Sequence, residues 1–207
     1  MTELTGAHRD ALIEATVAEF ASAGYEGASL NRIIRAAGIS KSSFYHAVAS
    51  KAELLDAVVE SLIRDVRARW TPPSPADFRH GRFWATVDAV LVDLAALAAD
   101  DRALGLLGRI FYLPTTGAAD ARSALLGTVR TWLDEVLRVG AASGAVRTDV
   151  PVDALAAAAF GMLRGLDEWA LTDPASPGAA SAAAAPGILL RAMLQPGPVA
   201  NPPRPPR

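Results

Sequence analysis

Basic side chains are concentrated in one short part of the chain, residues 29–51, called the basic window below. Its four bases are Arg32, Arg35, Lys41 and Lys51. The window contains no acid, whereas the flanking residues 1–28 and 52–70 carry all nine acids of the first 70 residues. Because the 207-residue chain has a net charge of −2, the positive charge is local. A local basic patch on a nearly neutral protein is typical of a nucleic-acid contact.

Two short helices are predicted within this window, joined by a turn that contains Gly38. The first is expected over residues 29–37 with Ser29 as its N-cap, and the second follows Ser40 and runs to about residue 47. Such a pair forms a helix-turn-helix. The side chains expected to pack the pair together are Ile33, Ala37, Ile39, Phe44 and Val48. This packing leaves the opposite face of the second helix free to enter a DNA major groove, which is about 12 Å wide.

That free face carries side chains suited to both kinds of DNA contact. Its members are Lys41, Ser42, Ser43, Tyr45 and His46. The lysine, together with Lys51 and the exposed N-termini of neighbouring helices, can meet phosphates and set affinity and register. The two serines and the histidine are short polar groups that can read base edges. Tyr45 has two alternatives, a contact to a phosphate or a thymine methyl, or a place in the core.

Helical periodicity continues along the rest of the chain, and the predicted fold class is all-α. Alanine, the strongest helix former, supplies 44 of the 207 residues, and no segment shows the two-residue period of a strand. A helix is expected over residues 8–23, ended by Gly24, and a long fourth helix from a capping box at Ser50 to about residue 70. Further helices are expected over residues 79–99, 101–112, 118–143, 152–171 and 179–194. The last contains Pro186, so it is either kinked there or reduced to residues 188–194.

A proline-rich break at residues 71–75 predicts the domain boundary. The expected architecture is an N-terminal three-helix domain over residues 8–68, with the helix-turn-helix at 29–48. The long fourth helix joins it to a C-terminal helical bundle over residues 76–195. Residues 196–207 contain six prolines and are expected to be disordered.

The sequence around the motif resembles the tetracycline-repressor (TetR) family of bacterial regulators. The resemblance covers residues 8–65 without a gap and rests on the runs GYEGAS (24–29), IIRAAGISKSSFYH (33–46) and SKAELL (50–55). It implies a homodimer that binds a palindromic operator on double-stranded DNA, usually represses, and is released by a small-molecule effector in the C-terminal domain. It also implies that Ser29, Asn31 and Arg32 lie near phosphates at the start of the second helix, and that Lys51 holds a phosphate at the start of the fourth.

Large side chains in the C-terminal half are candidates for lining an apolar effector cavity. They are Trp84, Phe111, Tyr112, Trp132, Met162 and Trp169, with Arg109 as the charged contact. Filling the core of an alanine-rich bundle is the alternative role for each of them. This set predicts an apolar or aromatic effector.

A row of small residues predicts the dimer interface. Ala157, Gly161 and Gly165 recur at four-residue spacing, which lets two helix backbones approach closely. Leu189, Leu190 and Met193 on the last helix are candidates to complete a four-helix seam. Packing within one subunit is the alternative.

Other function classes lack their motifs. The chain has no G-x-G-x-x-G, P-loop or G-x-S-x-G, and its three histidines have no acid–base partner at a useful spacing, so we expect neither an enzyme nor a cofactor. It has no cysteine and no metal-ligand spacing, and its longest uncharged stretch, residues 174–190, is interrupted by proline and glycine. We therefore expect no metal, no membrane span and a cytoplasmic location. The predicted function is a DNA-binding repressor; the alternative is a helical ligand-binding or interaction protein of the same fold that activates or no longer binds DNA.

Overall fold

The structure is a computed structural model that describes residues 6–79, 81–113, 120–172 and 184–197. Every regular element in these ranges is helical, which confirms the predicted all-α class. The chain divides into two compact units. The N-terminal unit consists of Met1–Thr71 and Ala96–Gly127, and the C-terminal unit of Pro72–Ala95 and Thr128–Arg207.

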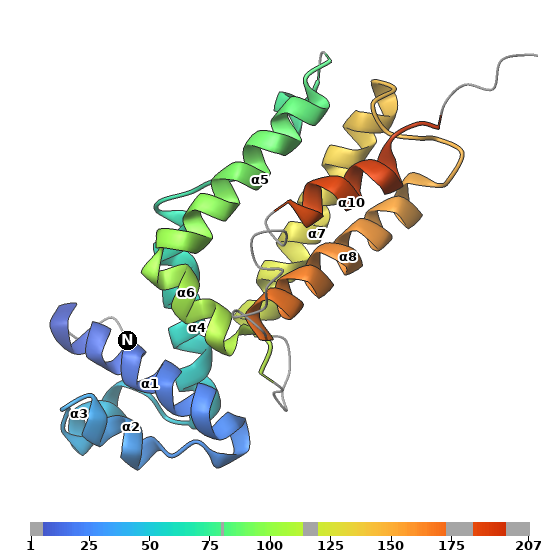
Figure 1. Cartoon of the computed structure of the whole chain (residues 1–207). Helices are drawn as coiled ribbons and strands as arrows, with labels where there is room; N and C mark the ends of the chain where they lie inside the picture. The colour runs from blue at the N-terminus through green and yellow to red at the C-terminus, as the bar shows by residue number, and fades with distance from the viewer. Residues whose placement is uncertain (1–5, 80, 114–119, 173–183, 198–207) are drawn as a thin grey trace, which may run out of the picture. The chain divides into compact units, whose positions relative to one another are not determined.

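The N-terminal unit is built on α1 (Gly6–Gly27), α2 (Leu30–Ala36), α3 (Lys41–Ala47), α4 (Lys51–Arg67) and α6 (Arg102–Phe111). α6 packs alongside α4 and α1 (Figure 1). One continuous core joins these helices, with Leu12 and Phe20 of α1, Leu54 of α4 and Ile110 of α6 fully buried in it. The helix predicted over residues 101–112 is thus part of the unit that carries the helix-turn-helix.

Local signals in the sequence account for most helix ends in this unit. Gly38 has the positive φ of 66° that the predicted turn requires, and Ser40 Oγ accepts the Ser43 amide at 3.1 Å. Ser50 Oγ accepts the Glu53 amide at 3.1 Å, and Glu53 in return accepts the amide of Ala49 at 2.8 Å. Gly24, with a φ of 67°, interrupts the first helix where the sequence predicted its end, and a second short helical stretch within α1 runs on to Gly27. α4 ends at Arg67, somewhat before the predicted residue 70.

The C-terminal unit contains the 3₁₀ turn η1 (Pro75–Phe78), α8 (Val152–Thr172), α10 (Ala185–Leu194) and most of α5 (Phe83–Asp100) and α7 (Ala121–Ala142). The helix expected from residue 79 begins only at Phe83, because a capping box between Ser74 and Asp77 forms η1 first. Phe78 is buried, 5.8 Å from the rings of both Phe83 and Trp132.

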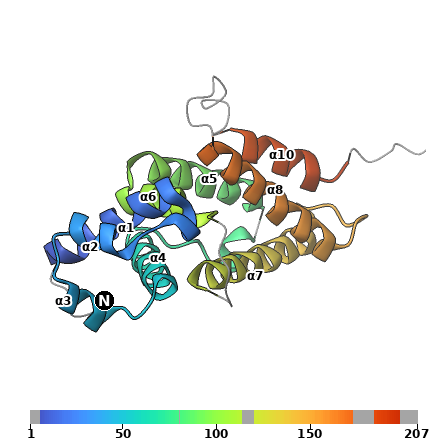
Figure 2. The same cartoon turned by 90° about the horizontal axis from the view of Figure 1, so that it is seen from below.

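α8 and α10 lie side by side in both views (Figures 1 and 2). Pro186 stands in the first turn of α10, where its missing N–H breaks no helical hydrogen bond. In the described residues this helix begins at Ala185 and contains Pro186, so it starts before residue 188, where the shortened alternative would begin; residues 179–183 of the expected helix lie outside them. Most of the predicted disordered tail, residues 198–207, also lies outside. Within the described ranges, no helix is both long and apolar enough to cross a bilayer.

Candidate nucleic-acid interface

α3 is held in place by the residues beneath it. Phe44 is fully buried and Val48 nearly so, and both pack in the core with Ile33 and Ala37 of the preceding helix and turn. A seven-residue helix is not stable alone in water, so its position depends on this packing. The five side chains expected to pack the pair thus all lie in or against one core, with Ile39 partly buried at its edge.

The opposite face of α3 is open to solvent. Lys41, Ser42, Ser43, Tyr45 and His46 are all exposed. Tyr45 is 51% exposed and meets Phe44 edge-on at 5.2 Å, so it is not a core residue. The hydroxyl of Ser40 lies 3.1 Å from that of Ser42 and 2.8 Å from that of Ser43, which orients both serines at the start of the helix.

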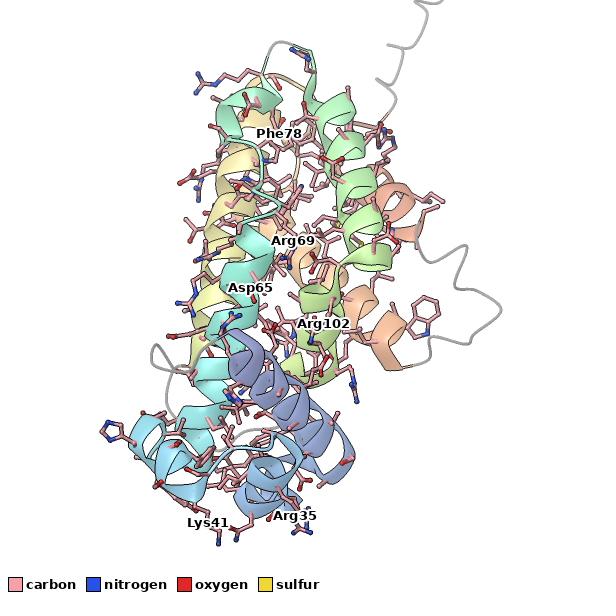
Figure 3. The ribbon with its side chains drawn as sticks, turned by 90° about the vertical axis from the view of Figure 1, so that its left-hand side faces the viewer. Arg35, Lys41, Asp65, Arg69, Phe78 and Arg102 are labelled. Carbon is pink, nitrogen blue, oxygen red and sulfur yellow. The ribbon has the colours of Figure 1, made fainter. Side chains whose placement is uncertain are left out.

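The four bases of the basic window fall into two classes. Arg35 and Lys41 are exposed and extend from the same end of the unit (Figure 3). Neither side chain has an ion pair or a hydrogen bond to any residue that the structure describes. Arg35 was counted in the basic window but not among the candidate DNA contacts; its exposure adds it to them.

Arg32 is bound to Glu19 of α1 instead. Its Nε donates to both carboxylate oxygens, at 2.8 and 3.0 Å, and an Nη donates to the carbonyl of Gly27 at 2.8 Å. The backbone N–H of Ser29 also donates to Glu19, at 2.8 Å, while the Ser29 side chain makes no capping bond. The hydrogen bond from Arg32 holds the pKa of Glu19 below its usual value. Asn31 is exposed.

Lys51 is likewise engaged within the protein. Its ammonium donates to the carbonyls of Glu26 at 3.0 Å and Ala28 at 3.3 Å, and it lies 5.0 Å from the centre of the Tyr25 ring. A cation over an aromatic face is stabilised by the ring quadrupole. Lys51 therefore ties the start of α4 to the connection between α1 and α2.

The candidate effector residues are divided between the two units. Arg109, Phe111 and Tyr112 belong to the N-terminal unit, and Trp84, Trp132, Met162 and Trp169 to the C-terminal unit. The indole N–H of Trp132 donates to the Pro73 carbonyl at 2.8 Å, and that of Trp84 to the Ala145 carbonyl at 3.1 Å. Neither unit by itself brings all seven together.

A hollow of about 510 Å³ lies on the C-terminal unit, at the junction of η1 and α5. Its lining residues are Ala76, Asp77, Arg79, Arg82, Ala85, Thr86 and Ala89. None of them is a candidate effector residue.

The small residues proposed for the dimer interface lie on an open face of α8. Ala157, Gly161 and Gly165 are exposed, and a Cβ added at either glycine would meet no atom of the residues that the structure describes within 4 Å. On α10, Leu189 is 40% exposed, Met193 is partly buried, and Leu190 is buried within its own unit.

An ion pair connects α6 to the end of α4. Asp101, the N-cap of α6, accepts the Leu104 amide at 2.8 Å and a guanidinium N–H of Arg69 at 3.0 Å. The bond to Arg69 is the largest influence on the pKa of Asp101 and lowers it. Nearby, Arg122 donates to the Leu113 carbonyl at 2.9 Å, and Asp56 of α4 accepts the Ala121 amide at 2.7 Å.

Asp101→Ala should lower the free energy of unfolding at pH 7 by about 0.5–2 kcal/mol, because it removes both the cap and the ion pair. The folded pKa of Asp101 is depressed, so its contribution is complete above the unfolded value of about 3.9 and is lost as the pH falls through the folded value. Urea unfolding at pH 7, 5 and 3 should show that the difference in free energy of unfolding between wild type and Asp101→Ala becomes smaller toward pH 3. Asp101→Asn, which keeps a capping oxygen, should differ less from wild type. A difference for Asp101→Ala that does not change with pH would contradict a stabilising ion pair between Asp101 and Arg69.

The chain is similar to known proteins both in sequence and in fold. Residues 12–58, from α1 into α4, match the family model described as bacterial regulatory proteins, tetR family. No curated protein sequence matches the chain.

Among solved structures, SmeT, the repressor of the Stenotrophomonas maltophilia multidrug efflux pump SmeDEF, matches with a TM-score of 0.67 at 17% identity, covering 100% of this chain and 98% of its own. A TetR family regulator from Chloroflexus aurantiacus has a TM-score of 0.64 at 23% identity, covering 93% and 88%. A gamma-butyrolactone receptor has a TM-score of 0.56 at 19% identity, covering 90% and 95%. At these identities the likeness establishes the fold.

Proposed function

We propose that this chain, which belongs to the tetR family of bacterial regulatory proteins, is a cytoplasmic repressor that binds an inverted-repeat operator as a homodimer. One observation carries the proposal. The exposed face of α3 presents Lys41, two serines, Tyr45 and His46 from a helix fixed by a fully buried Phe44, and no acid lies within the basic window. This is the arrangement that a recognition helix needs in order to enter a major groove in one fixed register.

Dimerisation is proposed through the open face of α8. Two copies related by a two-fold axis would address two half-sites about 34–36 Å apart, one helical turn of DNA. The open space at Gly161 and Gly165 supports this assignment: a Cβ added there would meet no atom of the described residues within 4 Å, so the close approach that small residues permit is unused among them.

Release by a small molecule is the third part of the proposal. SmeT is the repressor of a multidrug efflux pump, and another structure of this fold is a gamma-butyrolactone receptor. We propose an apolar or aromatic effector here, contacting candidates such as Trp84, Trp132 and Met162. We propose α6 as the transmitting element, since it packs against α4 and its N-cap Asp101 is bonded to Arg69, just after the end of α4. The required coupling is typically about 1–3 kcal/mol.

Selection of bound duplexes from a random DNA library tests the proposal directly. The full-length protein would be incubated with the library in moderate salt, and the recovered sequences aligned. An inverted repeat is the expected result. Recovery of no preferred sequence, from protein that melts cooperatively and carries no effector, would overturn the sequence-specific function. Recovery of a direct repeat, or of a single half-site, would overturn the proposal of a symmetric dimer.

Base readout is assigned to Ser43 and His46, and their replacement should change sequence preference. Ser43→Ala or His46→Ala should relax the preference at one position in each half-site, at a cost of about 1–3 kcal/mol for the favoured base. The measurement is a competition between operator duplexes that carry each base at that position. Arg67→Ala, an exposed change near the end of α4, is the matched control. An equal loss of affinity for all four bases would assign these residues to the DNA backbone instead.

A further inference from the structure

We propose that Glu19 is a built-in substitute for a DNA phosphate, which occupies Arg32 and the Ser29 amide so that they are not available to DNA. The phosphate contacts of the basic window then come from Arg35 and Lys41. This inference rests on the proposed DNA-binding function. It assigns a role to Glu19 and removes from the phosphate contacts two residues that the sequence had placed among them.

The contacts of Glu19 are those that a bound phosphate would make. Its carboxylate accepts two bonds from Arg32 Nε, at 2.8 and 3.0 Å, one from an Nη at 2.5 Å and one from the Ser29 amide at 2.8 Å. Guanidinium and backbone N–H groups bind carboxylates and phosphates in the same way, through charge-assisted hydrogen bonds. The donors on this side of α2 are therefore already satisfied by an anion of the protein itself.

Exchange of this anion for a DNA phosphate is unfavourable. The Glu19 side chain is 13% exposed with Arg32 in place, and releasing Arg32 would leave its carboxylate without its cation. An approaching phosphate would also face the negative charge of Glu19 at close range. Arg32 further donates to the Gly27 carbonyl, which holds the guanidinium against the end of α1.

Arg35 and Lys41 have the opposite character. Both are exposed, they lie at the same end of the N-terminal unit (Figure 3), and neither has a side-chain partner among the described residues. Neutralising a phosphate with such a side chain costs no internal bond and releases a counterion from the DNA. The difference between the two classes of base is therefore visible in the salt dependence of binding.

The first experiment measures binding of the full-length protein to a mixed-sequence duplex over a series of salt concentrations. A nonspecific duplex is suitable because its binding is electrostatic. Arg35→Ala and Lys41→Ala should each reduce the slope of log Kobs against log [salt] by about 0.9 per protomer, as expected for one lost phosphate contact. Arg32→Ala should leave the slope unchanged. Arg67→Ala, which removes an exposed arginine outside the basic window, is the control for net charge.

The second experiment frees Arg32 without removing it. Glu19→Gln keeps the shape of the side chain but loses its charge, and it should steepen the slope by about 0.9 per protomer as Arg32 becomes available. The double variant Glu19→Gln with Arg32→Ala should return to the wild-type slope. Glu60→Gln, an equal change of charge at an exposed position of α4, controls for net charge. A change of stability alone does not alter the slope, so the readout separates this role from simple support of the fold.

Two results would overturn the inference. The first is that Arg32→Ala reduces the slope of log Kobs against log [salt] as much as Arg35→Ala does. The second is that Glu19→Gln has the same slope as wild type. If Arg32→Ala did not fold, the Glu19→Gln result would decide. A wild-type protein that shows no salt-dependent binding to DNA would instead contradict the proposed function, which keeps the two failures distinguishable.

Discussion

Gly161→Leu is expected to separate the proposed dimer into monomers and to reduce affinity for the proposed operator by roughly 100-fold or more. The reduction follows because two linked half-site contacts gain about 10²–10⁴ in avidity over one. A Cβ added at Gly161 would meet no atom of the described residues within 4 Å, so the monomer should accommodate a larger side chain there. In a close two-fold contact between α8 helices, the same side chain would collide with its symmetry mate. Sedimentation at micromolar concentration measures the assembly, and a DNA titration measures the affinity.

Two controls make this result specific. Gly161→Ala adds one methyl group and should leave most of the dimer intact. Gly105→Leu places the same bulk on an exposed glycine of α6, where an added Cβ also has open space, and should leave the protein dimeric. An intact dimer in the Gly161→Leu variant would reject the α8 interface, whatever the affinity for DNA.

Phe44→Ala should unfold the N-terminal unit or leave it too unstable to bind DNA. Phe44 is fully buried, and removing a buried phenylalanine side chain typically costs about 3–5 kcal/mol. Domains of this kind have only about 5–15 kcal/mol of stability in total. Thermal melting followed by circular dichroism should show a large loss for this variant, and Phe44→Leu, which refills most of the volume, should recover much of it.

The adjacent residue provides the sharpest comparison. Tyr45→Ala removes a ring of nearly the same size one position along the helix, but that ring is 51% exposed. Its melting temperature should remain close to that of wild type while its affinity for DNA falls. If Tyr45→Ala destabilised the protein as much as Phe44→Ala, the assignment of the two rings to opposite faces of α3 would be wrong.

The sequence predicted the helix-turn-helix well because its signals are local. Gly38 needs a positive φ, Ser40 and Ser50 cap the helices that follow them, and the spacing of Ile33 and Phe44 defines which faces pack. Each of these effects acts over a few residues, so it can be recognised without knowledge of the fold. The exposed set on α3 followed from the same spacing.

Interactions between distant residues were not predictable in this way. Nothing near Arg32 in the chain indicates that Glu19, thirteen positions earlier, would neutralise it, or that Lys51 would bind the carbonyl groups of Glu26 and Ala28. The spacing on the last helix likewise grouped Leu190 with Leu189, although only the latter is exposed. Such partners depend on how the helices pack, and the short-range patterns of a single sequence do not reveal this packing.

The N-terminal unit is discontinuous in sequence, and this affects how the protein can be made and divided. Its core includes Leu107 and Ile110 of α6, which are synthesised well after the prolines at positions 72, 73 and 75. During synthesis on the ribosome, the hydrophobic surface of α4 remains exposed until α6 has been made and can cover it. Long-range contacts of this kind also slow folding. A fragment or chimera cut at the prolines would leave α6 behind and expose that surface to aggregation. A transplantable DNA-binding module of this protein therefore needs residues 96–127 joined to residues 1–71 by a designed linker.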